Sequence, residues 1–199
     1  TTSNIICSKD STGHLATIAG ATWGSQGRNF DGTDDQVSAG NATSLRITGA
    51  ITLECWAKWD TISSNPAWVV CRSGAIWAGV GYAIGADDNA PGERLISHFS
   101  NSVNDWNQVV VNSSLVLGQW IHLAATYDGV SVSYFYKNGV QIGTTDYAIQ
   151  MVANASPITI GSNAQYYLDG TIGEVRIYNR VLTASEVQRN YQVTKWRYS

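Results

Sequence analysis

The sequence predicts an all-β fold, an antiparallel two-sheet jelly-roll sandwich with one short C-terminal helix, and three observations carry this prediction. The chain is rich in Gly (19), Tyr (10) and Trp (8), and aromatic and β-branched side chains suit a pleated, half-buried surface. Short runs of alternating apolar and polar residues follow one another, separated by Gly, Asn and Asp turn signals. Helical periodicity occurs only near the C-terminus, so the chain lacks the helices that βαβ units need.

Length and composition favour one domain that spans residues 1–199. A chain of 199 residues suits one large β domain and can bury a substantial core. Hydrophobic residues make up 44% and charged residues only 14%, the reverse of the balance in disordered chains. We find no linker, low-complexity tract or internal repeat that would divide it.

The first clear strand is predicted over 51–59, where Ile51, Leu53, Cys55, Ala57 and Trp59 fall on one face. Thr52, Glu54, Trp56 and Lys58 alternate onto the other face. Further strands are expected over 67–72, 80–85, 94–99, 109–111 and 115–117. The intervening segments 73–79 and 100–108 are interpreted as loops that carry aromatic residues.

A three-strand antiparallel meander is predicted over 120–142. The strand 120–127 is followed by Asp128-Gly129, and the strand from Val130 to Tyr136 is followed by Asn138-Gly139, both two-residue hairpin signals. Two more strands are expected over 158–161 and 171–178. Thr183-Ala-Ser-Glu186 is a capping-box pattern, which predicts a short helix over 184–191.

Charge and hydropathy exclude two classes of partner. The formal net charge is −3, and the 12 Lys and Arg are scattered singly, so there is no basic stripe for nucleic acid. No apolar run approaches the roughly 20 residues of a membrane helix, so we expect no membrane insertion. No signal peptide is visible at Thr1, which means either that none existed or that the numbered chain begins after processing.

The three cysteines, Cys7, Cys55 and Cys71, do not predict zinc binding, because their number is odd and no CxxC pair occurs. Cys55 and Cys71 lie in apolar strand-like runs, which favours two buried thiols. A Cys55–Cys71 bridge between neighbouring strands is the alternative in an oxidising compartment.

Five sequence blocks occur in an order that resembles a known family. They are S-K-D-S-T-G-H (8–14), F-D-G-T-D-D-Q-V (30–37), I-T-L-E-C-W-A-K (51–58), W-I-H-L-A-A-T-Y-D-G with Y-K-N-G (120–139), and L-D-G-T-I-G-E-V-R-I-Y-N-R-V-L-T-A-S-E-V (168–187). Together they resemble the laminin G-like, concanavalin A-like jelly-roll domains. Two departures are Gly173, where the family often has Asp, and a degenerate or absent first strand, with 4–7 as a weak substitute.

The resemblance implies one structural Ca²⁺ between the early loop and the last strand. Calcium takes six to eight oxygen ligands. By resemblance the candidate ligands are Asp10 and Glu174, joined by Asp34 or Asp35, with backbone carbonyls near Ser8, Gly13 and His14 completing the shell. The alternative is that these aspartates are ordinary turn residues. Because Gly173 supplies no carboxylate, any such site is expected to be weaker than is usual in the family.

The sequence does not predict an enzyme. Glycosidases on this fold need paired carboxylates, which alternate positions of one strand would supply. The chain has only four Glu (Glu54, Glu93, Glu174 and Glu186), its clearest strands show no E-x-D pattern, and no Ser lies in a G-x-S-x-G elbow. His122, inside a predicted strand, is interpreted as a packing residue.

Carbohydrate binding is the leading functional hypothesis, because sugars present flat C–H faces rimmed by hydroxyls and proteins meet them with aromatic rings beside polar side chains. The candidates in the long connections are Trp77, Tyr82, Asp105, Trp106, Asn107, Gln108, Tyr166 and Tyr167. Trp and Tyr also fill β cores, and that is the interpretation we favour for Trp56, Trp59 and Trp120.

The alternative is a structural or interaction module, such as a virion decoration, appendage or adhesin domain. An unpaired sheet edge would support this by pairing with another chain or with a second copy of this one. A glycoside hydrolase is the least favoured reading. For both the carbohydrate-binding and the interaction hypothesis, the expected partner is a glycan or another surface protein. The expected location is extracellular, at a cell surface or at a virion surface.

Overall fold

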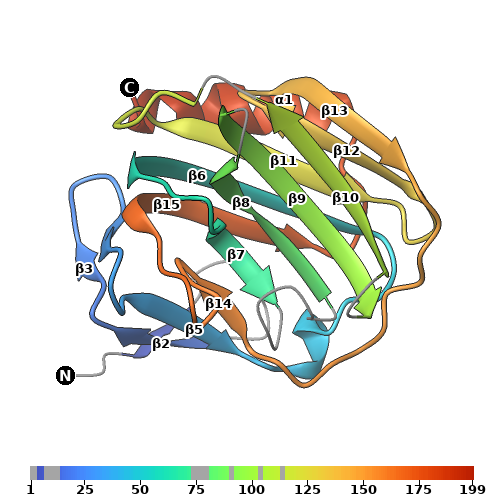
Figure 1. Cartoon of the computed structure of the whole chain (residues 1–199), viewed down its shortest axis with the longest axis horizontal. Helices are drawn as coiled ribbons and strands as arrows, with labels where there is room; N and C mark the ends of the chain where they lie inside the picture. Colours follow the sequence, from blue (N-terminus) through green and yellow to red (C-terminus); the bar gives the residue numbers. More distant parts are fainter. Residues whose placement is uncertain (1–3, 7–13, 73–80, 90–91, 103–104, 113–114) are drawn as a thin grey trace.

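The computed structural model describes residues 4–6, 14–72, 81–89, 92–102, 105–112 and 115–199. Within these residues two antiparallel sheets pack face to face, and one α-helix, α1 (Ala184–Thr194), lies outside them (Figure 1). The predicted all-β sandwich with one short C-terminal helix is therefore confirmed.

The first sheet contains eight of the described strands. In spatial order they are β1 (Asn4–Ile6), β2 (Leu15–Ala19), β5 (Gln36–Gly40), β14 (Ile158–Ile160), β7 (Ala67–Arg72), β8 (Gly81–Asn89), β9 (Gly92–Ser102) and β10 (Asp105–Asn112). Strand β1 pairs antiparallel with β2, so the short segment 4–6 does serve as the first strand and forms one edge of this sheet.

The second sheet contains seven of the described strands. In spatial order they are β13 (Val140–Asp146), β12 (Val132–Lys137), β11 (Ile121–Tyr127), β6 (Ile51–Thr61), β15 (Asp169–Tyr178), β4 (Arg28–Asp31) and β3 (Thr22–Trp23). Strand β15 lies between β6 and β4, so three segments far apart in sequence run side by side. Two 3-10 helices, η1 (Thr43–Leu45) and η2 (Lys195–Arg197), complete the described elements.

The core lies between the sheets and follows the predicted alternation of β6. Ile51, Leu53, Cys55, Ala57 and Trp59 are each at most 1% exposed and join one large apolar cluster. Burying a large apolar side chain contributes roughly 1.5–3 kcal/mol, so this inward row is a main source of stability. The prediction that Trp59 is a core residue is confirmed.

The opposite face of the second sheet is covered by helix α1. Val187 of the helix and Leu182 before it pack on Ala124 and Tyr136 of the sheet. The predicted capping box is confirmed, since the Thr183 side chain accepts from the Glu186 N–H and the Glu186 carboxylate accepts from the Thr183 N–H. The helix extends to residue 194, one turn beyond the predicted end.

The two predicted hairpin turns behave differently. Asn138 and Gly139 both have positive φ, as a tight two-residue turn requires, and β12 and β13 pair across them. The prediction at Asp128-Gly129 is wrong in length, because β12 begins at Val132. The Asp128 carboxylate accepts hydrogen bonds from the backbone N–H groups of Val130, Ser131 and Val132, which holds a longer turn.

Two other predictions are corrected. Residues 115–117 form a turn rather than a strand: the Gln119 N–H donates to the Val116 carbonyl, and Gly118 adopts a φ of +74°. Residues 100–108 are not a long loop, because β9 extends to Ser102 and pairs with β10 from Asp105 onward. Tertiary pairing overrides the low strand propensity of the Asn-rich sequence here.

Cys55 and Cys71 are both buried thiols that are not bonded to each other, which confirms the favoured interpretation. Cys55 belongs to the central core, whereas Cys71 belongs to a separate cluster with Trp68, Ala83 and Ile96. The alternative Cys55–Cys71 bridge is therefore wrong. Burial raises the pKa of the Cys55 thiol far above its usual range, and the neighbouring charge of Glu54 adds to this. Cys7 lies outside the described residues.

Among the described residues, no helix has both the length and the apolar character needed to span a bilayer.

Candidate functional site

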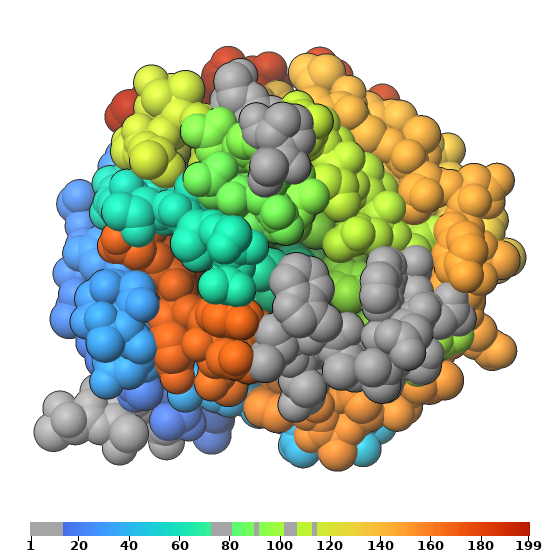
Figure 2. All heavy atoms as spheres, in the orientation of Figure 1, coloured from blue at the N-terminus to red at the C-terminus, as the bar shows by residue number. Residues whose placement is uncertain are grey.

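A groove opens where three connections meet at one end of the second sheet. Its walls come from the β4–β5 connection (32–35), the β6–β7 connection (62–66) and the β14–β15 connection (161–168). The cavity volume is about 550 Å³, within the range of small-ligand sites. In Figure 2 the light blue, teal and orange segments that form these walls meet on the left of the face shown.

The floor of the groove follows from the central position of β15. Asp169 is paired with Asp31 of β4 on one side and with Thr61 of β6 on the other. The Thr61 hydroxyl donates to the Asp169 carboxylate at 2.7 Å. Gly32 approaches Asp169 so closely that a Cβ at position 32 would lie 3.0 Å from the Asp169 Cβ, and its φ of +75° also favours glycine.

The tyrosine wall is held in place by its own loop. The Asn163 side-chain oxygen accepts from the N–H groups of Gln165 (3.2 Å) and Tyr166 (2.8 Å), and the Asn163 N–H donates to the Tyr166 carbonyl. Ser162 also forms a β-bridge with Tyr167. The two tyrosines are half-buried and stand on a fixed backbone, so little conformational entropy would be lost when a ligand binds.

The remaining lining groups are uncharged, and all of them except Gly32, Ile62 and Ala67 have polar side chains. Ser63 and Asn65 come from the β6–β7 wall, and Gln165 stands beside the tyrosines. The Asn65 N–H donates to the Ser63 hydroxyl at 3.3 Å, which closes a tight local turn. The groove therefore combines two aromatic rings, amide and hydroxyl groups, and the carboxylates of Asp31 and Asp169.

An aspartate cluster adjoins this groove. Carboxylate oxygens of Asp31, Asp34 and Asp35 lie within 4.8 Å of one another. Asp35 is buried and accepts a hydrogen bond from the Asp31 N–H at 3.0 Å. Burial raises the Asp35 pKa; the Asp31 hydrogen bond opposes this, while the charges of Asp31 and Asp34 add to it. The Thr33 N–H donates to the Asp31 carboxylate, as in an ordinary aspartate turn.

The predicted ligand-binding residues do not form one site. Tyr166 and Tyr167 line the groove. Tyr82 is in the core, where its hydroxyl donates to the Leu45 carbonyl. Asn107 is fully buried, and its amide donates to backbone carbonyls of Ser131 and Tyr147. The placement of Tyr82 and Asn107 in exposed loops was therefore wrong, because alternation along β8 and β10 turns both side chains inward.

The other predicted ligand-binding residues give no further information on the site. Gln108, next to Asn107 on β10, is half-buried. The backbones of Asp105 and Trp106 belong to β10, but their side chains lie outside the part of the chain that the structure describes. Trp77 lies outside it entirely.

The predicted metal ligands are also separated. Asp34 and Asp35 come together with Asp31, which the sequence had not singled out as a ligand. Glu174 lies five residues along β15 from Asp169, roughly 16 Å away at the rise of a strand. Its carboxylate forms an ion pair with Arg176 at 2.8 Å. Glu174 is thus not brought to the aspartates, and Asp10 lies outside the described residues.

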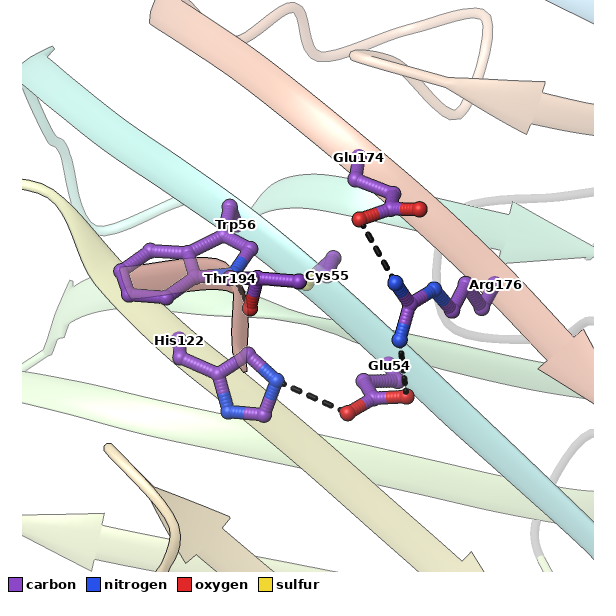
Figure 3. A pocket seen from close by; sticks show the side chains of 7 residues that line it. All are labelled: Glu54, Cys55, Trp56, His122, Glu174, Arg176 and Thr194. Atoms are coloured by element: carbon purple, nitrogen blue, oxygen red, sulfur yellow. Dashed lines mark hydrogen bonds and ion pairs between the residues drawn. The ribbon is translucent and has the colours of Figure 1, made fainter. Parts of the chain in front are cut away.

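A buried polar cluster lies beneath helix α1, and sequence reasoning missed it (Figure 3). Glu54, only 2% exposed, accepts from His122 at 2.9 Å, and its other oxygen lies 3.6 Å from Arg176. Tyr178 and Asn190 also donate to Glu54, at 3.1 and 2.9 Å. The sequence signal was weak, because these residues come from three strands and the helix.

This cluster fills the space between the second sheet and helix α1. Figure 3 shows Arg176 between the carboxylates of Glu54 and Glu174, and the side chains fill the space so that no cavity remains. The Trp56 indole N–H donates to the Thr194 hydroxyl at 2.9 Å, tying the helix to the sheet. Trp56 and His122 are both buried, in agreement with their interpretation as packing residues, whereas Trp120 is only half-buried.

One sequence signal, a repeated tripeptide, is shared by two segments that form the groove. D-G-T occurs twice, at 31–33 and 169–171, in two of the family-like blocks. The structure pairs these two aspartates directly across β4 and β15. The sequence alone does not predict that pairing, because the two tripeptides are far apart along the chain.

A family model described as the concanavalin A-like lectin/glucanases superfamily matches residues 31–188. The chain belongs to this superfamily. The match runs from the end of β4 into the first half of helix α1 and includes every described wall of the groove. A search of curated proteins gave no match.

Solved structures with the same fold are only distantly similar in sequence. Domain 4 of AbnA, a GH43 extracellular arabinanase from Geobacillus stearothermophilus, in complex with arabinotriose, has a TM-score of 0.70 and 19% identity over 90% of each chain. The ligand binding domain of botulinum neurotoxin serotype D, in complex with N-acetylneuraminic acid, has a TM-score of 0.71 and 12% identity. The binding domain of Paraclostridial Mosquitocidal Protein 1 has a TM-score of 0.65 and 14% identity.

This chain spans about half the length of each of the two toxin domains. The alignments include 96% of this chain, but 50% of the neurotoxin domain and 47% of the mosquitocidal domain. At these identities the likeness establishes the shared fold.

Proposed function

We propose that this chain is a non-catalytic carbohydrate-binding module and that a glycan binds in the groove bounded by 32–35, 62–66 and 161–168. The observation that carries the proposal is the fixed Tyr166–Tyr167 pair beside the carboxylates of Asp31 and Asp169 in a cavity of about 550 Å³. Two of the similar structures have a sugar in their complexes, arabinotriose in one and N-acetylneuraminic acid in the other, which supports this choice of ligand.

The chemistry of the lining suits a sugar. A tyrosine ring offers a flat apolar face to the C–H side of a pyranose or furanose, and its hydroxyl provides a polar handle. Sugar hydroxyls donate well to carboxylates, and hydrogen bonds to charged groups are the stronger kind. Asn65 and Gln165 carry amides that both donate and accept, so they can meet the remaining hydroxyls.

The calcium expectation remains a proposal and is restricted to Asp31, Asp34 and Asp35. Three carboxylates close together, one of them buried, form the oxygen-rich donor set that Ca²⁺ prefers. Bound there, the ion would offset the burial and the neighbouring negative charges that raise the Asp35 pKa, and it would stiffen the 32–35 wall. No residue beyond this wall is assigned as a ligand.

A protein-binding role is the second candidate. Trp23, on the edge strand β3, and Trp196, in η2, are each 69% exposed, which is unusual for tryptophan. An exposed tryptophan on an open edge strand, as Trp23 is, suits an interaction or assembly module. Under either role we propose an extracellular, cell-surface or virion-surface location, in keeping with the arabinanase domain, whose parent enzyme is extracellular.

The proposal is tested with a glycan array probed in Ca²⁺ and in excess chelator. Tyr166→Ala and Tyr167→Ala should each weaken binding to any retained glycan at least tenfold, about 1.4 kcal/mol. Tyr134→Ala is the matched control, because Tyr134 is an exposed tyrosine on β12, far across the sheet. Absence of glycan binding, together with self-association, would favour the interaction module.

Two further readouts separate the parts of the proposal. Release of new reducing ends from a bound oligosaccharide would contradict the non-catalytic assignment. If binding or thermal stability depends on Ca²⁺, and Asp34→Asn abolishes that dependence, the calcium proposal holds. Identical behaviour in calcium and chelator would rule it out.

A further inference from the structure

We infer that the groove selects uncharged oligosaccharides and discriminates against sialylated, sulfated and uronate-containing glycans. This inference rests on the proposed function and concerns the same site. It follows from the negative sign of the charges around the groove.

Every charged side chain that lines the groove among the described residues is acidic. Asp31 and Asp169 form its floor, and both are directly paired on neighbouring strands. Asp34 and Asp35 lie within reach of Asp31 and, when no Ca²⁺ is bound to them, increase the negative charge of one wall. At the other wall, the exposed Asp88 donates its backbone N–H to the Ser63 carbonyl at 2.7 Å.

The basic residues of the described chain do not line the groove, and several have partners elsewhere. Arg28, the nearest along the sequence to Asp31, lies over the Trp23 ring at 4.1 Å and donates to the Ala21 carbonyl. Lys58 lies over the Trp120 ring, and Arg94 is held by a bidentate ion pair. Of the 12 Lys and Arg, only Lys9 lies outside the described residues, and none of the other eleven lines the groove.

An anionic sugar in this groove would meet several carboxylates and no described cation. Like charges a few ångströms apart repel, and the repulsion is weakly screened because the Debye length is about 10 Å at 0.1 M salt. A neutral sugar avoids this cost and still gains hydroxyl-to-carboxylate hydrogen bonds. Specificity of this kind arises from an unfavourable interaction with the wrong ligand as well as a favourable one with the right ligand.

The test compares matched glycan pairs that differ only in the acid, such as lactose-terminated and sialyl-lactose-terminated glycans, by titration calorimetry in Ca²⁺ and in chelator. The neutral member should bind at least tenfold more tightly than the acidic member. Raising the salt concentration from 0.05 to 0.5 M should reduce this difference in affinity. Asp169→Asn should also reduce it, whereas Asp146→Asn should not, since Asp146 is exposed at the end of β13 in the opposite part of the sheet.

The outcomes distinguish the inference from the proposal beneath it. Binding of an acidic glycan as tightly as its neutral counterpart would overturn the charge selection while leaving carbohydrate binding intact. If the difference in affinity between neutral and acidic glycans is the same in wild type and in Asp169→Asn, the proposed charge selection is also overturned, because the discrimination would then originate elsewhere. Binding of neither member of any pair in either buffer would instead remove the proposed function.

Discussion

Removal of the Glu54 side chain is the sharpest test of how helix α1 is held on the sheet. In Glu54→Ala, three donors lose their acceptor: His122, Tyr178 and Asn190. Breaking a buried charged pair by deleting one partner costs about 3–5 kcal/mol. Arg176 keeps its ion pair with Glu174, so the lost contact between Arg176 and Glu54 contributes little to the destabilisation. We expect the free energy of unfolding to fall by about 4 kcal/mol.

The measurement is urea unfolding at pH 7, followed by tryptophan fluorescence and by far-UV circular dichroism. A stability of 5–15 kcal/mol is usual for a domain, so the variant should remain folded in the absence of denaturant. Glu93→Ala is the control, because Glu93 is a half-buried glutamate on β9, and its removal should change stability by only about 0.5 kcal/mol.

A conservative variant separates charge from hydrogen bonding. Glu54→Gln keeps the side-chain volume and one acceptor oxygen, and its amide can donate to His122 if the ring proton moves to Nδ1. We therefore expect less than half of the loss seen with alanine. A loss below 1 kcal/mol in Glu54→Ala would refute the account, since it would mean that the network does not hold the helix.

Three further predictions concern single positions. Gly173→Ala should destabilise the protein by about 1–3 kcal/mol, because a Cβ there would lie 2.5 Å from the Tyr198 ring; a melting temperature as high as that of Gly49→Ala, where a Cβ meets nothing within 4 Å, would contradict this. Thr183→Ala should cost about 1 kcal/mol by removing the helix N-cap, measured by urea unfolding; an unchanged midpoint would show that the cap is dispensable. Burial lowers the pKa of His98 to about 4, so the unfolded chain binds a proton that the folded chain does not, and stability should fall by up to about 3 kcal/mol as pH drops from 6.5 to 4. In His98→Gln, stability should depend less on pH between 6.5 and 4. An equally steep pH dependence in this variant would show that His98 is not the group responsible.

The sequence predicted the regular parts of the fold well, because period-two alternation is a local property. The inward row of β6 and the Asn138-Gly139 turn needed only neighbouring residues to be recognised. The turn at Asp128 and the strand pairing of 100–108 depend on side-chain hydrogen bonds and on partners distant in sequence. Those features could not be derived from alternation alone.

The candidate site was predicted only in part, for the same reason. Tyr166 and Tyr167 were found because they stand together in a connection with no competing packing pattern. Tyr82 and Asn107 were misplaced because composition does not say which face of a strand is covered. Asp31 and Asp169 were missed as groove residues, since their proximity arises from the insertion of β15 between β4 and β6.

The Gly173 departure from the family pattern has a structural reason. The Tyr198 ring occupies the space next to Gly173, its hydroxyl accepts from the Glu174 N–H at 2.9 Å, and the ring stacks on Trp56 with 4.5 Å between centroids. An aspartate at position 173 would displace this ring. The C-terminal segment therefore packs where another member of the family would carry a carboxylate.

The most direct test of the central claim is a nuclear magnetic resonance titration of the ¹⁵N-labelled chain with the neutral oligosaccharide that binds best on the array. Carbohydrate binding in the groove predicts that the largest amide shifts lie in 31–35, 61–66 and 161–169, and that Tyr166→Ala removes them. Shifts centred on another surface, or saturating binding that leaves these three segments unchanged, would contradict the claim.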